Sequence, residues 1–376
     1  MRQISWIIRL FYSVGIILPT DDESTFRRVL SKTVDWIYVL FTAYLIGTDF
    51  YLVFVLEKRK VPLGFVISAF CGDFCNIAIR LVYMTRRSFI VPMLQKIQFA
   101  HQKLENKSNR GRRMWILVLV VCASWIYPCA MFAMFVRVLM TEKGPEVLQT
   151  GFFFMKYINQ ETVMALLVLI QFFMLQQMYV APGYFIGLCC YSYATLKLII
   201  RRSERNLMKK NQLCTFERYY FNITRHIVDC AISVEKALSR QLAILFNYLV
   251  AFIFIMMTLF LKDGSRIISS GLWLPNLSIL FLALLAFYSL SIQASDIHTS
   301  ALRMRKLVYN FCSKMDSPNN IDSNRIRFLL LVDSDAFPDK VVMSGWGMFV
   351  LNRNFILQTT GAIITYGAVI LQIEKK

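Results

Sequence analysis

Apolar stretches long enough to cross a bilayer recur along this chain, with more polar segments between them. A helix needs about 20 residues to span the hydrocarbon core of a membrane. Seven stretches have about that length: residues 34–56, 61–83, 114–136, 163–198, 242–261, 272–292 and 355–373. The pattern predicts an all-α membrane protein with seven transmembrane helices.

The fourth stretch is long enough for two crossings, and Pro182-Gly183 could break it. No polar turn separates its halves, and backbone exposed to lipid at a turn is costly because its polar groups find no partners. We therefore expect one long helix that bends near Pro182 and projects at its inner end into the cytoplasm.

The basic residues are distributed unevenly among the connections. Three connections are rich in Lys and Arg, with 8, 10 and 8 of them: residues 85–113, 197–241 and 293–354. The others hold only 3, 3 and 2: residues 57–60, 137–160 and 262–271. Basic loops remain in the cytoplasm. The N terminus is therefore expected inside the cell and the C terminus outside, which is inverted relative to a G-protein-coupled receptor.

Overall composition agrees with a membrane protein, since 57% of the residues are hydrophobic and 14% are aromatic. The net charge of +19 is explained by retention of basic loops, so nucleic acid is not an expected partner. Asp73 and Arg80 are charged positions within the second stretch. Arg80 is expected to extend toward the inner surface, and Asp73 could contact a polar ligand or play a local structural role.

Polar residues also interrupt the last apolar stretch. Thr365, Tyr366 and Gln372 lie beside Val369 on roughly one side of a helix. Polar groups at this depth should face other helices or water rather than lipid. The chain is therefore expected to end in a pore-lining helix.

The order of residues at this end is similar to a known signature. Thr365-Tyr366, five small or apolar residues and Gln372 resemble the C-terminal signature of insect gustatory receptors, which is threonine, tyrosine, five hydrophobic residues, glutamine and phenylalanine. Ile373 replaces the phenylalanine, and the odorant co-receptor branch of the same superfamily also accepts an aliphatic residue there. Residues 347–352 also resemble the family's run into its final helix.

The resemblance implies a ligand-gated, non-selective cation channel that a small-molecule tastant opens in the plasma membrane of gustatory receptor neurons. It implies a homotetramer, or a heterotetramer with related subunits, in which each last helix lines one pore. By the resemblance, Val369 forms the closed gate and Gln372 lines the open pore. Helical spacing places a set of residues on one face with them, Gln358, Ala362, Thr365 and Lys376, and Ile373 follows Gln372 at the signature's end.

The resemblance also places a ligand pocket in the outer half of spans one to six. Aromatic residues with a few polar neighbours suit a small, partly apolar molecule. The residues expected at that depth are Trp125, Tyr127, Phe132, Gln171, Phe172, Phe173, Trp273, Asn276 and Phe281, with Asp73 as a further candidate.

Four regions follow from these expectations. Residues 1–33 form a cytoplasmic segment with an interfacial helix, and residues 34–292 form the first six spans. Residues 293–354 form a cytoplasmic anchor, and residues 355–376 form the pore helix. Apolar residues among basic ones predict amphipathic helices in the anchor: Leu302, Leu307, Val308, Phe311, Phe328, Leu329 and Leu330.

Catalysis has little support in the sequence. The chain has only three histidines and neither a Gly-rich phosphate loop nor a Gly-x-Ser-x-Gly elbow. Its nine cysteines complete no zinc pattern, so no metal or cofactor is expected. A small-molecule transporter and a receptor that signals metabotropically through partners remain the alternatives to a channel.

Overall fold

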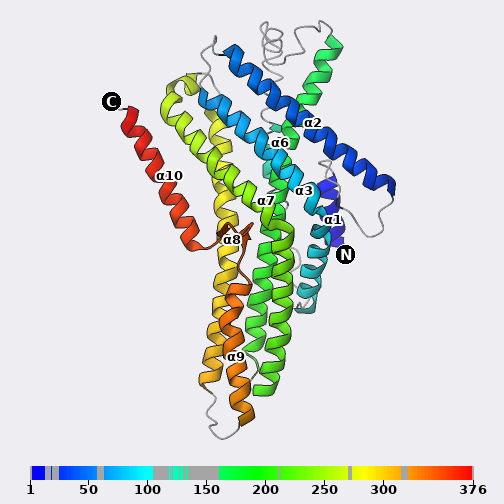
Figure 1. The fold of residues 1–376 in the computed structure, drawn as a ribbon, viewed down its shortest axis with the longest axis vertical. Helices are drawn as coiled ribbons and strands as arrows, with labels where there is room; N and C mark the ends of the chain where they lie inside the picture. Colours follow the sequence, from blue (N-terminus) through cyan, green and yellow to red (C-terminus); the bar gives the residue numbers. More distant parts are fainter. Residues whose placement is uncertain are drawn as a thin grey trace.

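The structure is a computed structural model that describes residues 2–12, 18, 25–56, 63–104, ten individual positions between 118 and 133, and residues 161–210, 212–269, 273–314 and 321–374. The helices are α1 (Arg2–Tyr12), α2 (Thr25–Leu56), α3 (Leu63–Leu104), α6 (Glu161–Leu207), α7 (Leu213–Ser269), α8 (Trp273–Ser313), α9 (Ile321–Lys340) and α10 (Arg353–Glu374). The expected all-α fold class is confirmed (Figure 1).

Several helices are much longer than a membrane crossing requires. Helix α7 has 57 residues and is therefore about 85 Å long, against about 30 Å for the hydrocarbon core. The lower parts of α6, α7 and α8 run side by side with α9 in one narrow bundle, whereas α2, α3 and α10 spread apart above it (Figure 1). This arrangement agrees with a membrane part above a helical anchor.

Three helices in the described part of the chain are long and apolar enough to cross a membrane, and they belong to α6, α7 and α8. The count of seven spans and the orientation of the termini therefore remain predictions. Helix α6 is continuous from Glu161 to Leu207 with Pro182 inside it. The prediction that the fourth apolar stretch forms one helix is confirmed.

The hydrophobic core follows α6, α7 and α8 down into the anchor. Phe246 of α7 packs edge-on against Phe287 of α8, with ring centroids 5.5 Å apart. Farther down, Phe216 and Phe311 stack face to face. Helix α9 covers the lower end of α8 and buries Phe337. Aromatic side chains from distant segments thus fill the bundle along most of its length.

The segment expected to form an anchor is helical, but only four of its seven apolar residues singled out from the sequence pack inward. Val308 and Leu330 are fully buried, and Leu307 and Phe311 are partly buried. Leu302, Phe328 and Leu329 instead face outward, and Phe328 is 66% exposed. The anchor therefore has an apolar outer surface that its own subunit does not cover.

The apolar segment near the N terminus forms helix α1, as expected. Ile7 is fully buried, and the edge of the Phe11 ring meets Tyr184 of α6 at a centroid distance of 5.8 Å. Trp6 remains partly exposed. Helix α1 is therefore held to the bundle by one face.

The expectation for Arg80 is wrong. Its side chain is only 5% exposed and forms an ion pair with Asp35 of α2, with a distance of 2.7 Å between nitrogen and oxygen. Arg87 contacts the other oxygen of Asp35 at 3.0 Å. A buried carboxylate partner makes extension to the membrane surface unnecessary, and the two arginines join α3 to α2.

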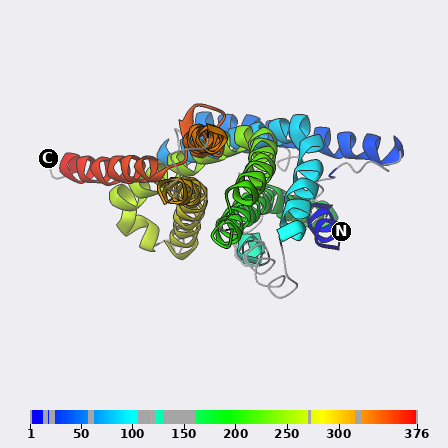
Figure 2. The ribbon, with the colours of Figure 1, turned by 90° about the horizontal axis from the view of Figure 1, so that it is seen from below.

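A short β-hairpin connects α9 to α10. Its strands are β1 (Ser344–Gly345) and β2 (Phe349–Val350), with Gly345 opposite Phe349. A Cβ atom on Gly345 would lie 2.3 Å from the Phe349 ring, so the ring fits only over a glycine. Trp346 and Gly347 adopt positive φ angles of 53° and 71° in the turn. Helix α10 then leaves the bundle on one side, while α2 projects on the other (Figure 2).

Candidate pore helix and ligand cavity

One face of α10 packs against α7 and α8. Ile363 is 6% exposed in this contact. The Tyr366 ring meets Phe254 of α7 edge-on at 4.8 Å, and the hydroxyls of Thr360 and Tyr288 of α8 are 3.0 Å apart. Tyr366, which the sequence grouped with Thr365 and Gln372, thus also contacts the bundle.

The opposite face of α10 is left uncovered by the described residues of the subunit. It includes the helix positions predicted to face a pore: Gln358, Ala362, Thr365, Val369 and Gln372 are all exposed. Val369 is 45% exposed although it is apolar. The Ile373 side chain and Lys376 lie outside the described residues. The structure thus brings the described members of the predicted pore face together on one uncovered surface.

The base of α10 is attached to α7 by a carboxylate that the sequence analysis did not identify. Glu235 Oε2 accepts a hydrogen bond from the Ser344 backbone N–H at 3.2 Å, and Oε1 accepts one from the Ser344 hydroxyl. Ser344 Oγ in turn accepts a hydrogen bond from the Gly347 N–H at 3.0 Å. Burial raises the pKa of Glu235 from its ordinary value of 4.5, and the hydrogen bonds from Ser344 oppose that rise.

Aromatic rings pack together where the hairpin leads into α10. Phe349 stacks on Phe355 at a centroid distance of 4.9 Å. Both rings meet Phe246 of α7 edge-on, at 5.8 and 5.7 Å. The start of α10 is therefore fixed to α7 by packing as well as by hydrogen bonds.

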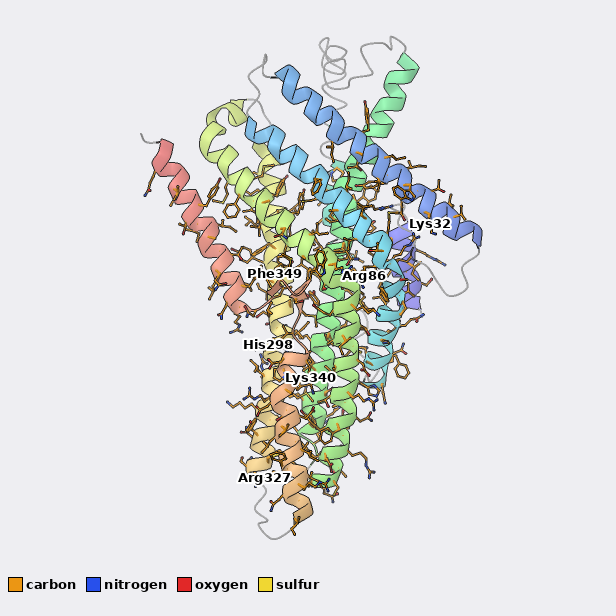
Figure 3. The ribbon with its side chains drawn as sticks, in the orientation of Figure 1. Lys32, Arg86, His298, Arg327, Lys340 and Phe349 are labelled. Atoms are coloured by element: carbon orange, nitrogen blue, oxygen red, sulfur yellow. The ribbon has the colours of Figure 1, made fainter. Side chains whose placement is uncertain are left out.

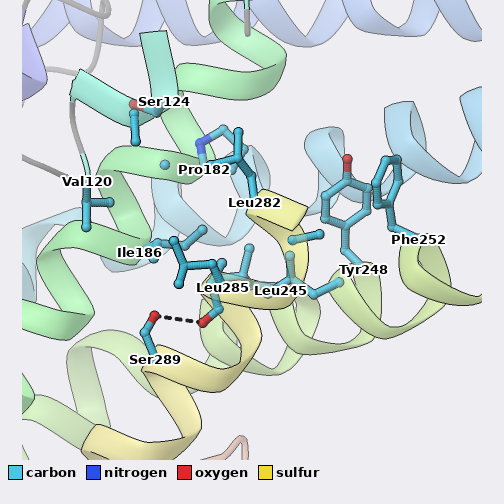
Figure 4. A pocket seen from close by; sticks show the side chains of 15 residues that line it. Val120, Ser124, Pro182, Ile186, Leu245, Tyr248, Phe252, Leu282, Leu285 and Ser289 are labelled. Atoms are coloured by element: carbon cyan, nitrogen blue, oxygen red, sulfur yellow. Dashed lines mark hydrogen bonds between the residues drawn. The ribbon is translucent and has the colours of Figure 1, made fainter. Parts of the chain in front are cut away.

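A small apolar cavity lies where α6, α7 and α8 meet the segment around Ser124 (Figure 4). Its volume is about 150 Å³. Its lining residues are Val120, Ala123, Ser124, Pro182, Gly183, Ile186, Leu245, Tyr248, Leu249, Phe252, Leu282, Ala283, Leu285, Ala286 and Ser289. The Ser289 hydroxyl donates a hydrogen bond to the Ala286 carbonyl at 3.1 Å. Few polar groups therefore face the cavity.

Small residues create this space. A Cβ atom on Gly183 would lie 2.3 Å from the Ser124 Cβ, so the glycine allows the Ser124 segment to approach α6 closely. Ala283 and Ala286 contribute only methyl groups from α8. The sequence shows these small residues, but it does not show that they lie opposite one another on neighbouring helices.

Of the predicted ligand residues, the two whose side chains the structure describes do not line this cavity. Trp125 follows Ser124 and donates a hydrogen bond from its indole N–H to the Tyr184 hydroxyl at 3.0 Å, while Phe281 is exposed. The rest lie outside the described side chains: Asp73, Tyr127, Phe132, Gln171, Phe172, Phe173, Trp273 and Asn276. The pocket expected in the outer half therefore remains a prediction.

Comparison with solved structures identifies the fold. The chain is similar to the insect olfactory receptor OR5 from Machilis hrabei, with a TM-score of 0.61 and 14% identity over 99% of this chain and 98% of that one. The structure of OR5 in complex with eugenol gives a TM-score of 0.60, with the same identity and coverage. No protein-family model matches the sequence, and no curated protein matches it.

The class that these comparisons define is the insect chemoreceptor fold. The fold that the tail signature implied agrees with this similarity, and membership of the gustatory receptors remains a prediction.

Proposed function

We propose that this chain is a subunit of a gustatory receptor, a ligand-gated and non-selective cation channel that a small-molecule tastant opens. The observation that carries the proposal is the uncovered face of α10, which combines apolar and polar residues from Gln358 to Gln372. The fold shared with an olfactory receptor supports it, and so does the tail signature, which matches the gustatory pattern except at Ile373.

Four copies of α10 around one axis would cover its exposed face. Val369 from each copy would form an apolar ring that excludes water and closes the path. Gln372, one turn farther along, would offer amide groups to a hydrated ion. Opening requires the four helices to move apart at Val369.

The exposed apolar surface of the anchor supports assembly of several subunits. Contiguous apolar surface on a soluble part of a protein commonly marks an interface. The residues that form this surface are Leu302 and Tyr309 of α8 and Ile321, Phe328, Leu329 and Val332 of α9. A homotetramer, or a heterotetramer with related subunits, would bury them below the membrane.

The apolar cavity indicates the size of a ligand. In other proteins an empty cavity of about 150 Å³ lined by aliphatic and aromatic residues binds benzene. The cavity beside Gly183 has about this volume. We therefore infer that the tastant presents one apolar ring of comparable size, while further polar groups would reach toward the outer half of the bundle.

Whole-cell recording tests this function. Cells that express the chain at the plasma membrane are exposed to a panel of small single-ring compounds and to sugars. A cation current evoked by a ring compound supports the channel. Uptake of the compound without current favours a transporter, and a response that requires G proteins favours metabotropic signalling.

A further inference from the structure

A second cavity, of about 350 Å³, lies where α3, α7 and the link from α9 to α10 meet. Its lining includes four basic side chains, Arg86, Lys236, Arg240 and Lys340, and one carboxylate, Glu235. Figure 3 shows Arg86 at about the height of Phe349, with Lys340 below them. The cavity therefore lies beside the cytoplasmic ends of the second, fifth and seventh predicted spans.

The described residues place few acidic groups against this cluster. Arg86 and Lys236 lie over the Phe89 ring, 5.5 and 4.3 Å from its centroid, and Arg240 lies 5.2 Å from the Trp346 ring. Contacts with aromatic rings orient a cation without cancelling its charge. Among the described residues, no carboxylate lies within ion-pair distance of these three cations.

The two carboxylates nearby have other partners. Glu235 accepts both hydrogen bonds from Ser344. Asp333 pairs with Lys340 at 3.0 Å, so within the described part of the chain Lys340 is the one basic residue of the cavity that has an acidic partner. Three cations from α3 and α7 thus line one cavity without an ion-pair partner among the described residues.

The number of Lys and Arg residues in a loop is enough to keep that loop in the cytoplasm. It does not explain why several of them should line the same cavity. Convergent Arg and Lys side chains at a cytoplasmic membrane surface suit phosphate groups, and Arg binds them with directed hydrogen bonds. The volume lies at the lower end of the range for small-molecule sites. We propose that this cavity binds an inositol ring that carries two or more phosphates, as in a phosphoinositide headgroup of the inner leaflet.

The site would also bring the phosphate group next to the link into α10. Val342 of this link lines the cavity. Arg240 belongs to both the cavity and the contact with Trp346 in the hairpin turn. The inference itself does not depend on the chain being a channel, because it concerns binding alone.

Binding to the purified full chain in detergent micelles tests the inference. The probes are dioctanoyl phosphatidylinositol 4,5-bisphosphate, soluble inositol 1,4,5-trisphosphate and dioctanoyl phosphatidylserine, and binding is followed by thermophoresis. The variant Arg86→Gln/Lys236→Gln/Arg240→Gln is compared with Lys209→Gln/Arg303→Gln/Arg325→Gln. The control removes the same number of charges from exposed positions away from the cavity, at the end of α6 and on α8 and α9. Both variants must elute like the wild type in size-exclusion chromatography.

Each basic residue near an anionic lipid surface strengthens binding by about fivefold. The cavity variant should therefore bind the bisphosphate on the order of 100-fold more weakly, whereas the control stays within about twofold of the wild type. Phosphatidylserine should bind more weakly than the bisphosphate. Equal affinity for the soluble trisphosphate would identify a soluble ligand, and preference for the bisphosphate would identify the lipid.

A second variant keeps the three cations in place. Ser239 lines the same cavity, and Ser239→Glu adds a negative charge there without removing a contact between a cation and a ring. It should weaken bisphosphate binding by at least about tenfold. The inference is overturned if the wild type fails to bind the bisphosphate, or if the cavity and control variants lose the same affinity, because only net charge would then matter.

Discussion

The hydroxyl of Tyr288 on α8 lies 3.0 Å from the hydroxyl of Thr360 on α10. This hydrogen bond joins the proposed pore helix to the bundle midway between its start and the proposed gate. Because both groups lie at a contact between helices, loss of either leaves the other without this partner.

Tyr288→Phe is expected to destabilise the protein by about 1 kcal/mol, and Thr360→Val by a similar amount. If the hydroxyls interact with each other, the double variant should lose little more than either single variant. Thermal unfolding of the purified chain in detergent measures all three. Strict additivity of the two losses would show that the hydroxyls do not stabilise each other.

Replacement of Glu235 should change how stability depends on pH. Burial raises the pKa of Glu235 above its ordinary value of 4.5, so the folded state holds the proton more tightly than the unfolded state. This contribution is complete below about pH 4.5 and is lost as the pH rises through the folded pKa. As the pH rises from about 4.5 through the folded pKa of Glu235, the unfolding temperature of the wild type should therefore fall relative to that of Glu235→Gln.

The control for this comparison is Asp335→Asn, which removes a half-exposed carboxylate of the anchor that pairs with Arg305. Between about pH 4.5 and 7.5, the difference in unfolding temperature between the wild type and Glu235→Gln should change with pH, and the difference between the wild type and Asp335→Asn should change less. A difference between wild type and Glu235→Gln that stays constant over this range would contradict a raised pKa.

Gly183→Ala should be more harmful than an ordinary glycine substitution. Its Cβ would lie 2.3 Å from the Ser124 Cβ, so the two segments must separate, at an expected cost of about 1–3 kcal/mol. Gly47→Ala on α2 is the matched control, because its Cβ meets nothing within 4 Å. Helix propensity predicts that the control stabilises α2 by up to about 1 kcal/mol. Equal unfolding temperatures for the two variants would refute the close contact.

Filling the apolar cavity should impair ligand responses. Ala286→Leu adds three carbon atoms to a cavity of about 150 Å³. The concentration of a ring compound that gives half of the maximal current should rise at least about tenfold. Loss of the apolar contact with the ring should weaken binding by more than about 1.4 kcal/mol, which corresponds to a tenfold change in affinity. Ile292→Phe enlarges an exposed side chain of the same helix and serves as the control. Unchanged responses of surface-expressed Ala286→Leu would place the ligand elsewhere.

Much of the fold was predictable from local features of the sequence. Six of the seven apolar stretches fall largely within described helices, α2, α3, α6, α7, α8 and α10. The absence of a polar turn near Pro182 correctly predicted one continuous α6. The tail from Thr365 to Gln372 led to the insect chemoreceptor fold. These features need only a single helix, or a short motif, to be recognised.

The remaining features depend on pairs of residues far apart in the chain. Arg80 was misjudged because Asp35, its buried partner, belongs to another helix. Ser344 and Glu235 are 109 positions apart, and the apolar cavity needs small residues of several helices in register. Such partners become visible only after the helices have packed together.

The most direct test of the proposed pore is whole-cell current from cells that express wild type, Val369→Ala or Ile364→Ala at equal surface levels. Both substitutions shorten an exposed apolar side chain of α10, and Ile364 is 65% exposed, but only Val369 lies on the proposed pore face. Val369→Ala should raise the basal or ligand-evoked cation current, with a reversal potential close to zero, while Ile364→Ala behaves like wild type. If Val369→Ala and Ile364→Ala both leave a measurable wild-type current unchanged, Val369 does not form the gate.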